Sequence, residues 1–121
     1  MESILNSVKK LLGITSEYTA FDVDIAMHIN SVFMILNQLG IGPENGFSIL
    51  DDTAVWTDFL PETDRNFEPI KSYIYLKVKL LFDPPSSSIV TESINRMISE
   101  LEWRMTTQAE LDRKEEIQNG K

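Results

Sequence analysis

The chain has 121 residues, of which 42% are apolar and 25% charged, and this balance predicts one globular domain with one core rather than a disordered chain. Its 19 acidic and 11 basic residues give a net charge of −8, so we do not expect the surface as a whole to bind DNA or RNA. The chain has no cysteine, which excludes disulfides, thiolate nucleophiles and cysteine-based zinc sites.

Two amphipathic helices are predicted in the first third of the chain. Residues 2–12 place apolar side chains at helical spacing and are followed by a glycine, which is common just after a helix. Residues 21–39 carry a longer apolar stripe that includes Ile29 and Leu36. The apolar residues of the first segment are too widely spaced for a signal peptide, and no apolar run is long enough to predict a membrane span.

Residues 40–66 form a connection that is long for a compact domain. We expect this segment to be ordered, because it carries large apolar side chains such as Phe47, Trp56 and Phe59. Thr53 is placed to cap a short helix that would bury Trp56. Two alternatives stay open for these aromatic residues: they fill the core of their own chain, or they contact a neighbouring subunit.

Residues 68–82 fit two patterns of secondary structure. Alternate positions are apolar, as in a strand, whereas Ile70, Ile74 and Val78 also lie on one helical stripe. The interval between the two flanking prolines is longer than a usual strand, and proline is favourable in the first turn of a helix. We therefore predict a helix.

A last helix is predicted after the Asp-Pro-Pro break, where the serines at 86–88 can cap it. Its apolar face runs to Met105 and includes Leu101, which we expect in the core. Trp103 lies on the opposite, polar side, so it is either covered by another part of the chain or serves as an anchor at a protein interface. Beyond Met105 the apolar spacing is lost, which predicts a solvated helix or a tail that is disordered in isolation.

Together these segments predict an all-α fold. The architecture we expect is a small bundle of about four helices, with a long ordered loop between the second and third and an extended C-terminal tail. Residues 1–105 would form the helical domain and residues 106–121 the polar tail.

The sequence offers little that points to catalysis or to metal binding. His28 is the one histidine and flanks the apolar face of its helix, which favours a packing role over catalysis. The acidic cluster Asp51, Asp52 and Asp58 lacks the alternating ligands and the glycine of a calcium loop. We therefore predict no catalytic residue, no metal site, no cofactor and no enzymatic activity, and expect a protein that acts by binding other proteins.

Four segments, spread over about residues 4–105, carry a family pattern: VKKLLGI, IAMHINSVFMILNQLGIGP, YIYLKVKLLFDPP and ISELEWRM. Together they resemble the head–tail connector (adaptor) proteins of long-tailed bacteriophages. The pair KVKLLFDPP and SELEWR carries most of the resemblance, since VKKLLGI alone would be weak.

The resemblance implies a structural virion protein, made in the host cytoplasm and located in the neck between head and tail. Such adaptors form a homo-oligomeric ring, here expected to be dodecameric, which lies beneath the portal protein and joins it to the next neck protein, a stopper or tail-side ring. DNA would pass through the centre without specific binding, and no membrane is involved. The tail at residues 106–121 corresponds by position, not by motif, to the family's portal-directed end.

The candidate partner-binding residues are the large apolar side chains of the long loop, the last helix and the tail: Phe47, Trp56, Phe59, Trp103, Leu111 and Ile117. The alternative function is a small acidic regulatory or antitoxin-like helical protein that binds a cytoplasmic partner. The two hypotheses differ in assembly, because a connector should form rings or bind portal, whereas a regulator should stay a monomer or dimer.

Overall fold

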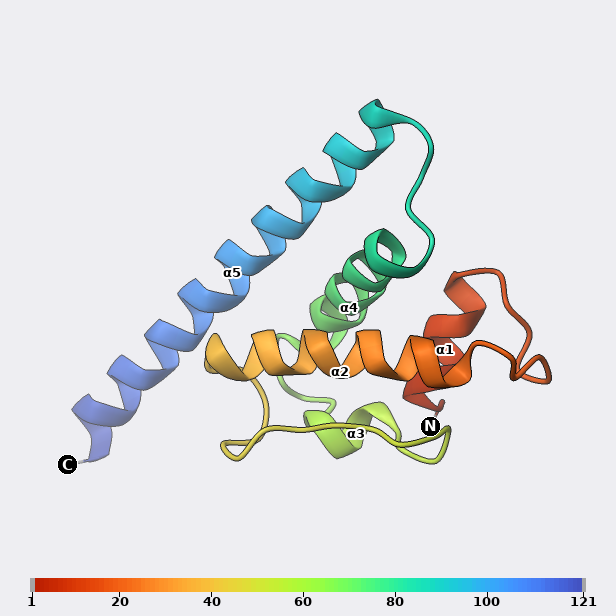
Figure 1. The fold of residues 1–121 in the computed structure, drawn as a ribbon. Helices are drawn as coiled ribbons and strands as arrows, with labels where there is room; N and C mark the ends of the chain where they lie inside the picture. The colour runs from red at the N-terminus through yellow and green to blue at the C-terminus, as the bar shows by residue number, and fades with distance from the viewer. Residues whose placement is uncertain (1, 121) are drawn as a thin grey trace.

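The computed structural model describes residues 2–120, apart from the side chains of residues 108, 109, 112, 113, 119 and 120. Within that part the regular structure is helical, and the one β contact is an isolated bridge between Ser3 and Val55. The helices are α1 (Ile4–Leu11), α2 (Asp22–Gln38), α3 (Trp56–Phe59), α4 (Phe67–Phe82) and α5 (Ser88–Gly120) (Figure 1). The all-α prediction is confirmed, and the segment that also fitted a strand pattern is helix α4.

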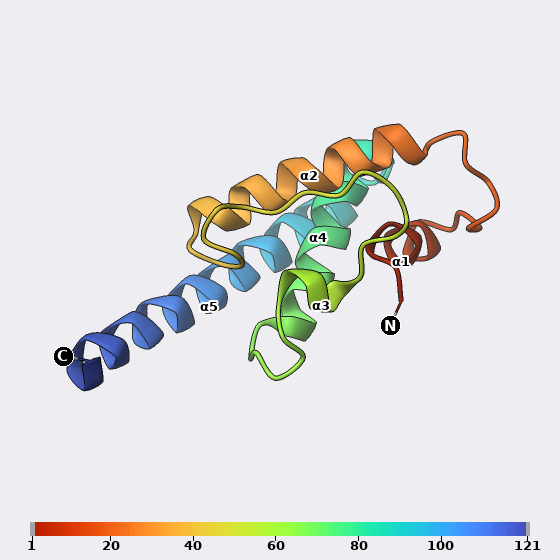
Figure 2. The same cartoon turned by 90° about the horizontal axis from the view of Figure 1, so that it is seen from below.

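Helix α4 lies at the centre of the bundle. Helices α2 and α5 both pack against it, and α1 packs against α2 and α4. The long connection runs alongside α2 on the side away from α5, and the C-terminal end of α5 projects beyond the other helices (Figures 1 and 2). The predicted boundary between residues 105 and 106 therefore lies inside a continuous helix, and Met105 is its last buried side chain among those described.

The core is built from the apolar faces that helical spacing predicted. Ile29, Leu36 and Val78 are completely buried. Leu101 is only partly buried, because α5 packs chiefly on α4 and Leu101 also borders a surface hollow with Ser72 and Met97. Leu101 was expected to be buried in the core, and it instead packs against the core while remaining partly exposed.

Two asparagines on α2 hold the long loop against the helix. The side-chain amide of Asn30 donates to the carbonyl oxygen of Ile49 at 2.9 Å, and the Ile49 N–H donates to Asn30 Oδ1 at 2.7 Å. One heptad later, Asn37 Nδ2 lies 3.3 Å from the carbonyl oxygens of both Pro43 and Glu44. Since residues seven apart lie on one side of a helix, the two amides fix the path of the loop along α2.

The short helix α3 begins differently from the sequence prediction. Thr53 does not cap it; its N–H and hydroxyl instead donate to Asp51 Oδ1, at 3.0 and 2.6 Å. The carboxylate of Asp58 accepts from the Val55 N–H at 2.9 Å, which satisfies one of the free donors at the helix start. The capping prediction failed because the turn before α3 uses Thr53 for its own closure.

Lys9, on α1, is buried against the connection between α1 and α2. Its ammonium lies 2.7 Å from Asp22 Oδ1 and donates to the carbonyl oxygens of Ser16 and Tyr18, at 3.2 and 2.8 Å. A buried charge is tolerated when it is paired and hydrogen-bonded in this way. Lys9 thus ties the polar connection to the start of α2.

Candidate interaction surfaces

The described residues hold no group of three or more histidine or acidic side chains that could bind a metal ion. No helix among residues 2–120 is long and apolar enough to cross a membrane. His28 is partly buried and its ring centroid lies 6.4 Å from that of Phe82, which agrees with the packing role predicted for it. The surface offers grooves and exposed apolar side chains, and these are the features with which such a chain can bind other proteins.

The three loop residues expected as partner contacts lie in the interior of the chain. Trp56 is 3% exposed and Phe59 is also buried, while Phe47 is partly buried. The rings of Phe33, Phe47 and Phe59 form a cluster with centroid distances of 4.7 to 5.4 Å. Of the two alternatives for the loop, the structure realises the first, because the loop folds back on α2 and adds its aromatic residues to the core.

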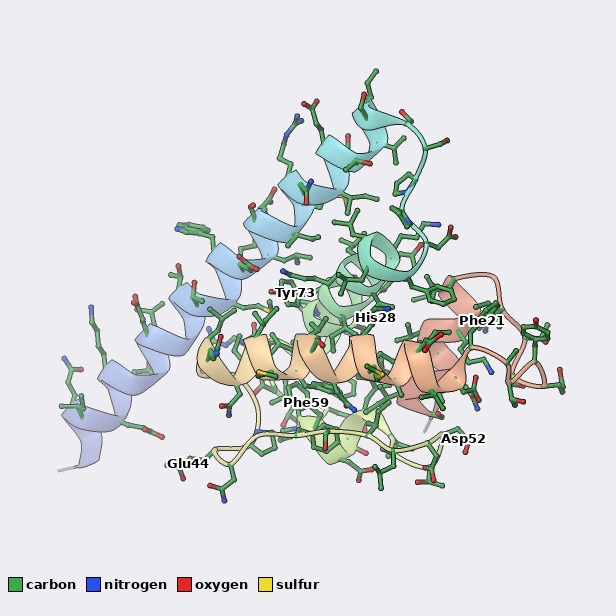
Figure 3. All side chains as sticks on the ribbon, in the orientation of Figure 1. Phe21, His28, Glu44, Asp52, Phe59 and Tyr73 are labelled. Atoms are coloured by element: carbon green, nitrogen blue, oxygen red, sulfur yellow. The ribbon has the colours of Figure 1, made fainter. Side chains whose placement is uncertain are left out.

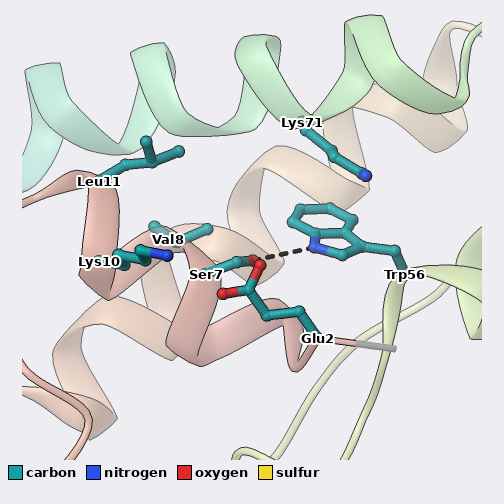
Figure 4. Close-up of a pocket in the computed structure, with 7 residues that line it drawn as sticks. All are labelled: Glu2, Ser7, Val8, Lys10, Leu11, Trp56 and Lys71. Carbon is teal, nitrogen blue, oxygen red and sulfur yellow. Dashed lines mark hydrogen bonds between the residues drawn. The ribbon is translucent and has the colours of Figure 1, made fainter.

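Trp56 also ties α3 to α1. Its indole Nε1 donates to Ser7 Oγ at 2.9 Å (Figure 4). Ser7 Oγ in turn donates to the Ile4 carbonyl oxygen at 3.1 Å. A hollow of about 240 Å³ lies beside the indole, with Lys71 and Glu2 among its lining residues. Two lysines, Lys10 and Lys71, line this hollow, and Lys71 pairs with Glu68 on its own helix at 3.1 Å.

The other predicted contacts lie on α5 and point to solvent. Trp103 is 68% exposed, and Leu111 and Ile117 are exposed farther along the helix. At 100° per residue, Leu111 and Ile117 fall about 80° and 40° to either side of Trp103, so all three share one side of α5. The placement of Trp103 outside the core is confirmed, and its role in partner binding stays a prediction.

A polar cluster fixes how α5 lies on α4. The Tyr73 hydroxyl donates to Glu102 Oε2 at 2.6 Å, and Lys77 Nζ lies 3.9 Å from the same oxygen. Burial, and then the Glu102 carboxylate, raise the pKa of Tyr73 well above its ordinary value. Successive helical residues are 100° apart, so holding Glu102 against α4 turns Trp103 away from it.

A groove of about 390 Å³ separates α2 from α5, and α4 forms its floor. Its lining is mostly apolar, with one lysine and the single histidine at the edge: His28, Ser31, Val32, Ile35, Lys77, Leu80, Leu81, Asn95 and Ile98. We name this feature the α2–α5 groove. Sequence patterns did not indicate it, because it depends on how three helices cross.

Leu50 is the most exposed large apolar side chain in the described part of the chain, at 95%. It lies between Ile49, which is buried and hydrogen-bonded to Asn30, and Asp51, which closes the turn with Thr53. The hydroxyl and N–H of Thr53 hold the pKa of Asp51 below its ordinary value. The backbone on both sides of Leu50 is thus fixed while its side chain stands in solvent, and the sequence alone did not distinguish it from its buried neighbours.

A family model described as phage connector protein matches residues 4–112. The chain belongs to this family. The match includes α1 to α4 and most of α5, and it confirms the resemblance carried by the four sequence segments. No curated protein and no solved structure matches the chain. The connector is therefore a structural component of a phage virion, a role that needs binding surfaces rather than a catalytic centre.

Proposed function

We propose that this connector is the adaptor subunit of the virion neck. In this proposal it forms a dodecameric ring beneath the portal protein and joins the capsid to the tail through the next neck protein, a stopper or tail-side ring. The observation that carries the proposal is the family match over residues 4–112. Nothing in the described residues favours the regulatory alternative over it.

A ring subunit needs two different lateral faces, because contacts related by rotation pair one face with another. The connector has two sides that differ in chemistry. The loop side of α2 carries acidic residues, among them Glu44, Asp51 and Asp52, while the α5 side carries the apolar α2–α5 groove with Lys77. Such unlike faces support a closed ring of identical subunits.

The net charge of the chain suits a DNA channel. Twelve copies at −8 each would give a ring of about −96. Like charge keeps the phosphate backbone from binding, so DNA can slide through the lumen. The proposal therefore includes DNA as a passing molecule rather than a specifically bound ligand.

The projecting end of α5 is the proposed contact with the portal. Trp103, Leu111 and Ile117 are exposed on one side of α5. Covering apolar surface contributes about 25 cal/mol per Å². A tryptophan that stands in solvent is also the residue type most often found as an interface anchor.

The proposal is tested by mixing the purified connector with purified portal and imaging the product by cryo-electron microscopy. A twelvefold ring attached to one end of the portal is the expected result. Sedimentation of the connector alone, at rising concentration, should show assembly beyond a dimer. A connector that stays a monomer or dimer and leaves portal unbound would contradict the proposal and favour the regulatory alternative.

A further inference from the structure

The loop presents Leu50 in a form suited to insertion into another protein. We name residues 48–53 the Leu50 turn. Its backbone is fixed by the two hydrogen bonds between Ile49 and Asn30 and by the contacts of Thr53 with Asp51. A side chain held out from a fixed backbone loses little conformational freedom on binding, so its burial contributes more to affinity.

The α2–α5 groove is a receptor of matching chemistry. Ile35, Leu80 and Ile98 provide apolar surface, and Leu81 at the edge is 54% exposed. The groove opens between α2 and α5 because these helices pack on α4 rather than on each other. With about 390 Å³ it is large enough for an apolar side chain and its neighbours, since ligand pockets begin at about 300 Å³.

The charges beside the two features are complementary. Asp51 and Asp52 follow Leu50 directly, and no hydrogen bond or ion pair engages Asp52 within the described residues. The charged residue in the groove lining is Lys77, whose ammonium forms a long ion pair with Glu102 at 3.9 Å and is still partly exposed. The chain has a net charge of −8, yet the groove lining contains a cation and no carboxylate. Such a groove favours binding of a segment that is both apolar and acidic.

The Leu50 turn and the groove lie on opposite sides of α2, so one chain cannot join them to each other. Figure 3 shows Asp52 on the loop side and His28 on the side of α4 and α5. A contact between unlike faces repeats head to tail and closes into a ring when the rotation allows. A second copy of the same chain thus carries the acidic, apolar segment that the groove accepts.

We propose that the Leu50 turn of one connector subunit inserts into the α2–α5 groove of the next, with Leu50 on the apolar floor and Asp52 toward Lys77. This inference rests on the proposed ring and identifies the two surfaces that build it. Burial of one leucine from a fixed turn corresponds to about tenfold to a hundredfold in affinity for each contact.

The first test uses the absence of native cysteine. A chain with both Leu50→Cys and Leu81→Cys should give a ladder of disulfide-linked oligomers on oxidation, because each contact joins a turn to a groove. Each single variant should remain uncrosslinked. The matched control pairs Leu50→Cys with Ile89→Cys, since Ile89 is also exposed, at 74%, but lies outside the groove. Dimers from Leu50→Cys alone would mean that two turns face each other, which overturns the inference.

The second test uses complementation. Leu50→Ser and Leu81→Glu alter exposed side chains, so both variants should fold. Each variant alone should weaken the affinity between subunits by tenfold or more. Mixed together they should form a one-to-one heterodimer and stop, because only one intact turn and one intact groove remain. Ile89→Ser, the control, should assemble as the wild type does.

The outcomes separate this inference from the proposed function. Wild-type chain that forms no ring, alone or on portal, overturns both. Rings that form equally well with Leu50→Ser overturn the inference and leave the adaptor function standing. The inference also fails if the thiol introduced by Leu81→Cys stays reactive in free rings and becomes protected only when portal is added, because the groove then belongs to the portal.

Discussion

The two tryptophans of the connector should respond oppositely to truncation. Trp56 is 3% exposed, so 97% of its surface is covered, whereas Trp103 is 68% exposed and only 32% is covered. We expect Trp56→Ala to reduce the free energy of unfolding strongly and to leave no separate effect on assembly. Trp103→Ala should reduce it little and should weaken attachment to portal or to neighbouring subunits.

The magnitudes follow from the covered areas. With roughly 250 Å² for a tryptophan side chain and about 25 cal/mol per Å², the cover on Trp56 corresponds to at most about 6 kcal/mol and that on Trp103 to at most about 2 kcal/mol. Alanine retains part of the buried surface, and large-to-small changes of this kind cost about 3–5 kcal/mol. Much of the cover on Trp103 comes from neighbouring turns of α5, so we expect a loss of about 1 kcal/mol or less.

The assay measures folding and assembly apart from each other. Thermal unfolding at low concentration should place Trp56→Ala about 12–20 °C below wild type and Trp103→Ala within about 4 °C, at roughly 4 °C per kcal/mol. The milder Trp56→Phe leaves Trp103 as the one fluorescent indole, whose emission should shift to the blue when a partner covers it. A Trp103→Ala chain that unfolds about 10 °C early yet joins portal normally would refute the argument and make Trp103 a core residue.

Three further predictions concern the core, the α4–α5 contact and the projecting helix. Leu36→Ala should cost about 2–5 kcal/mol in urea unfolding, and an unchanged midpoint would show that the buried face of α2 is misassigned. Because the pKa of Tyr73 is raised in the folded chain, the unfolded chain loses the hydroxyl proton first, and the free energy of unfolding should fall as pH rises above about 10. Tyr73→Phe should remove this pH dependence. A wild-type chain whose stability does not fall above about pH 10 would contradict the contact between Tyr73 and Glu102. Deletion of residues 106–121 should leave the melting temperature nearly unchanged, because Met105 is the last buried side chain of those described. The deletion should weaken portal binding in a pull-down. A truncated chain that binds portal with full affinity would show that the portal contact lies elsewhere.

Helical spacing was enough to predict the framework of the connector. The stripes that contain Ile29, Leu36 and Val78 gave the correct buried faces, since a helix that packs on one side repeats its apolar residues at fixed intervals. Segment length decided between strand and helix for α4, correctly. The start of α3 was not predictable in the same way. As a cap, the Thr53 hydroxyl oxygen would have accepted from a backbone N–H of α3, whereas the path of the loop has Thr53 donate to Asp51 instead.

The candidate contacts were predicted less well, for a physical reason. Composition indicates that the loop carries more apolar surface than solvent tolerates, but it does not say whether the same chain or another one covers it. Trp56 and Phe59 found cover on α1 and α2, while Leu50, of the same apolar class and in the same loop, did not. The paired hydrogen bonds between Asn30 and Ile49 hold the backbone beside Leu50, and sequence composition does not reveal them.

The use of the loop in the monomer core has a consequence for assembly. Because its loop aromatic residues pack within the chain, we expect the connector to fold before it meets a partner, and in the proposed ring each contact between subunits would cover a small surface. A ring compensates for weak single contacts, because closure makes every subunit bind twice and a portal template raises the effective concentration of neighbours. We therefore expect ring formation to depend steeply on concentration in free connector and much less on portal. Under the proposed function, we expect the subunit to assemble on portal at concentrations at which free connector is still dispersed.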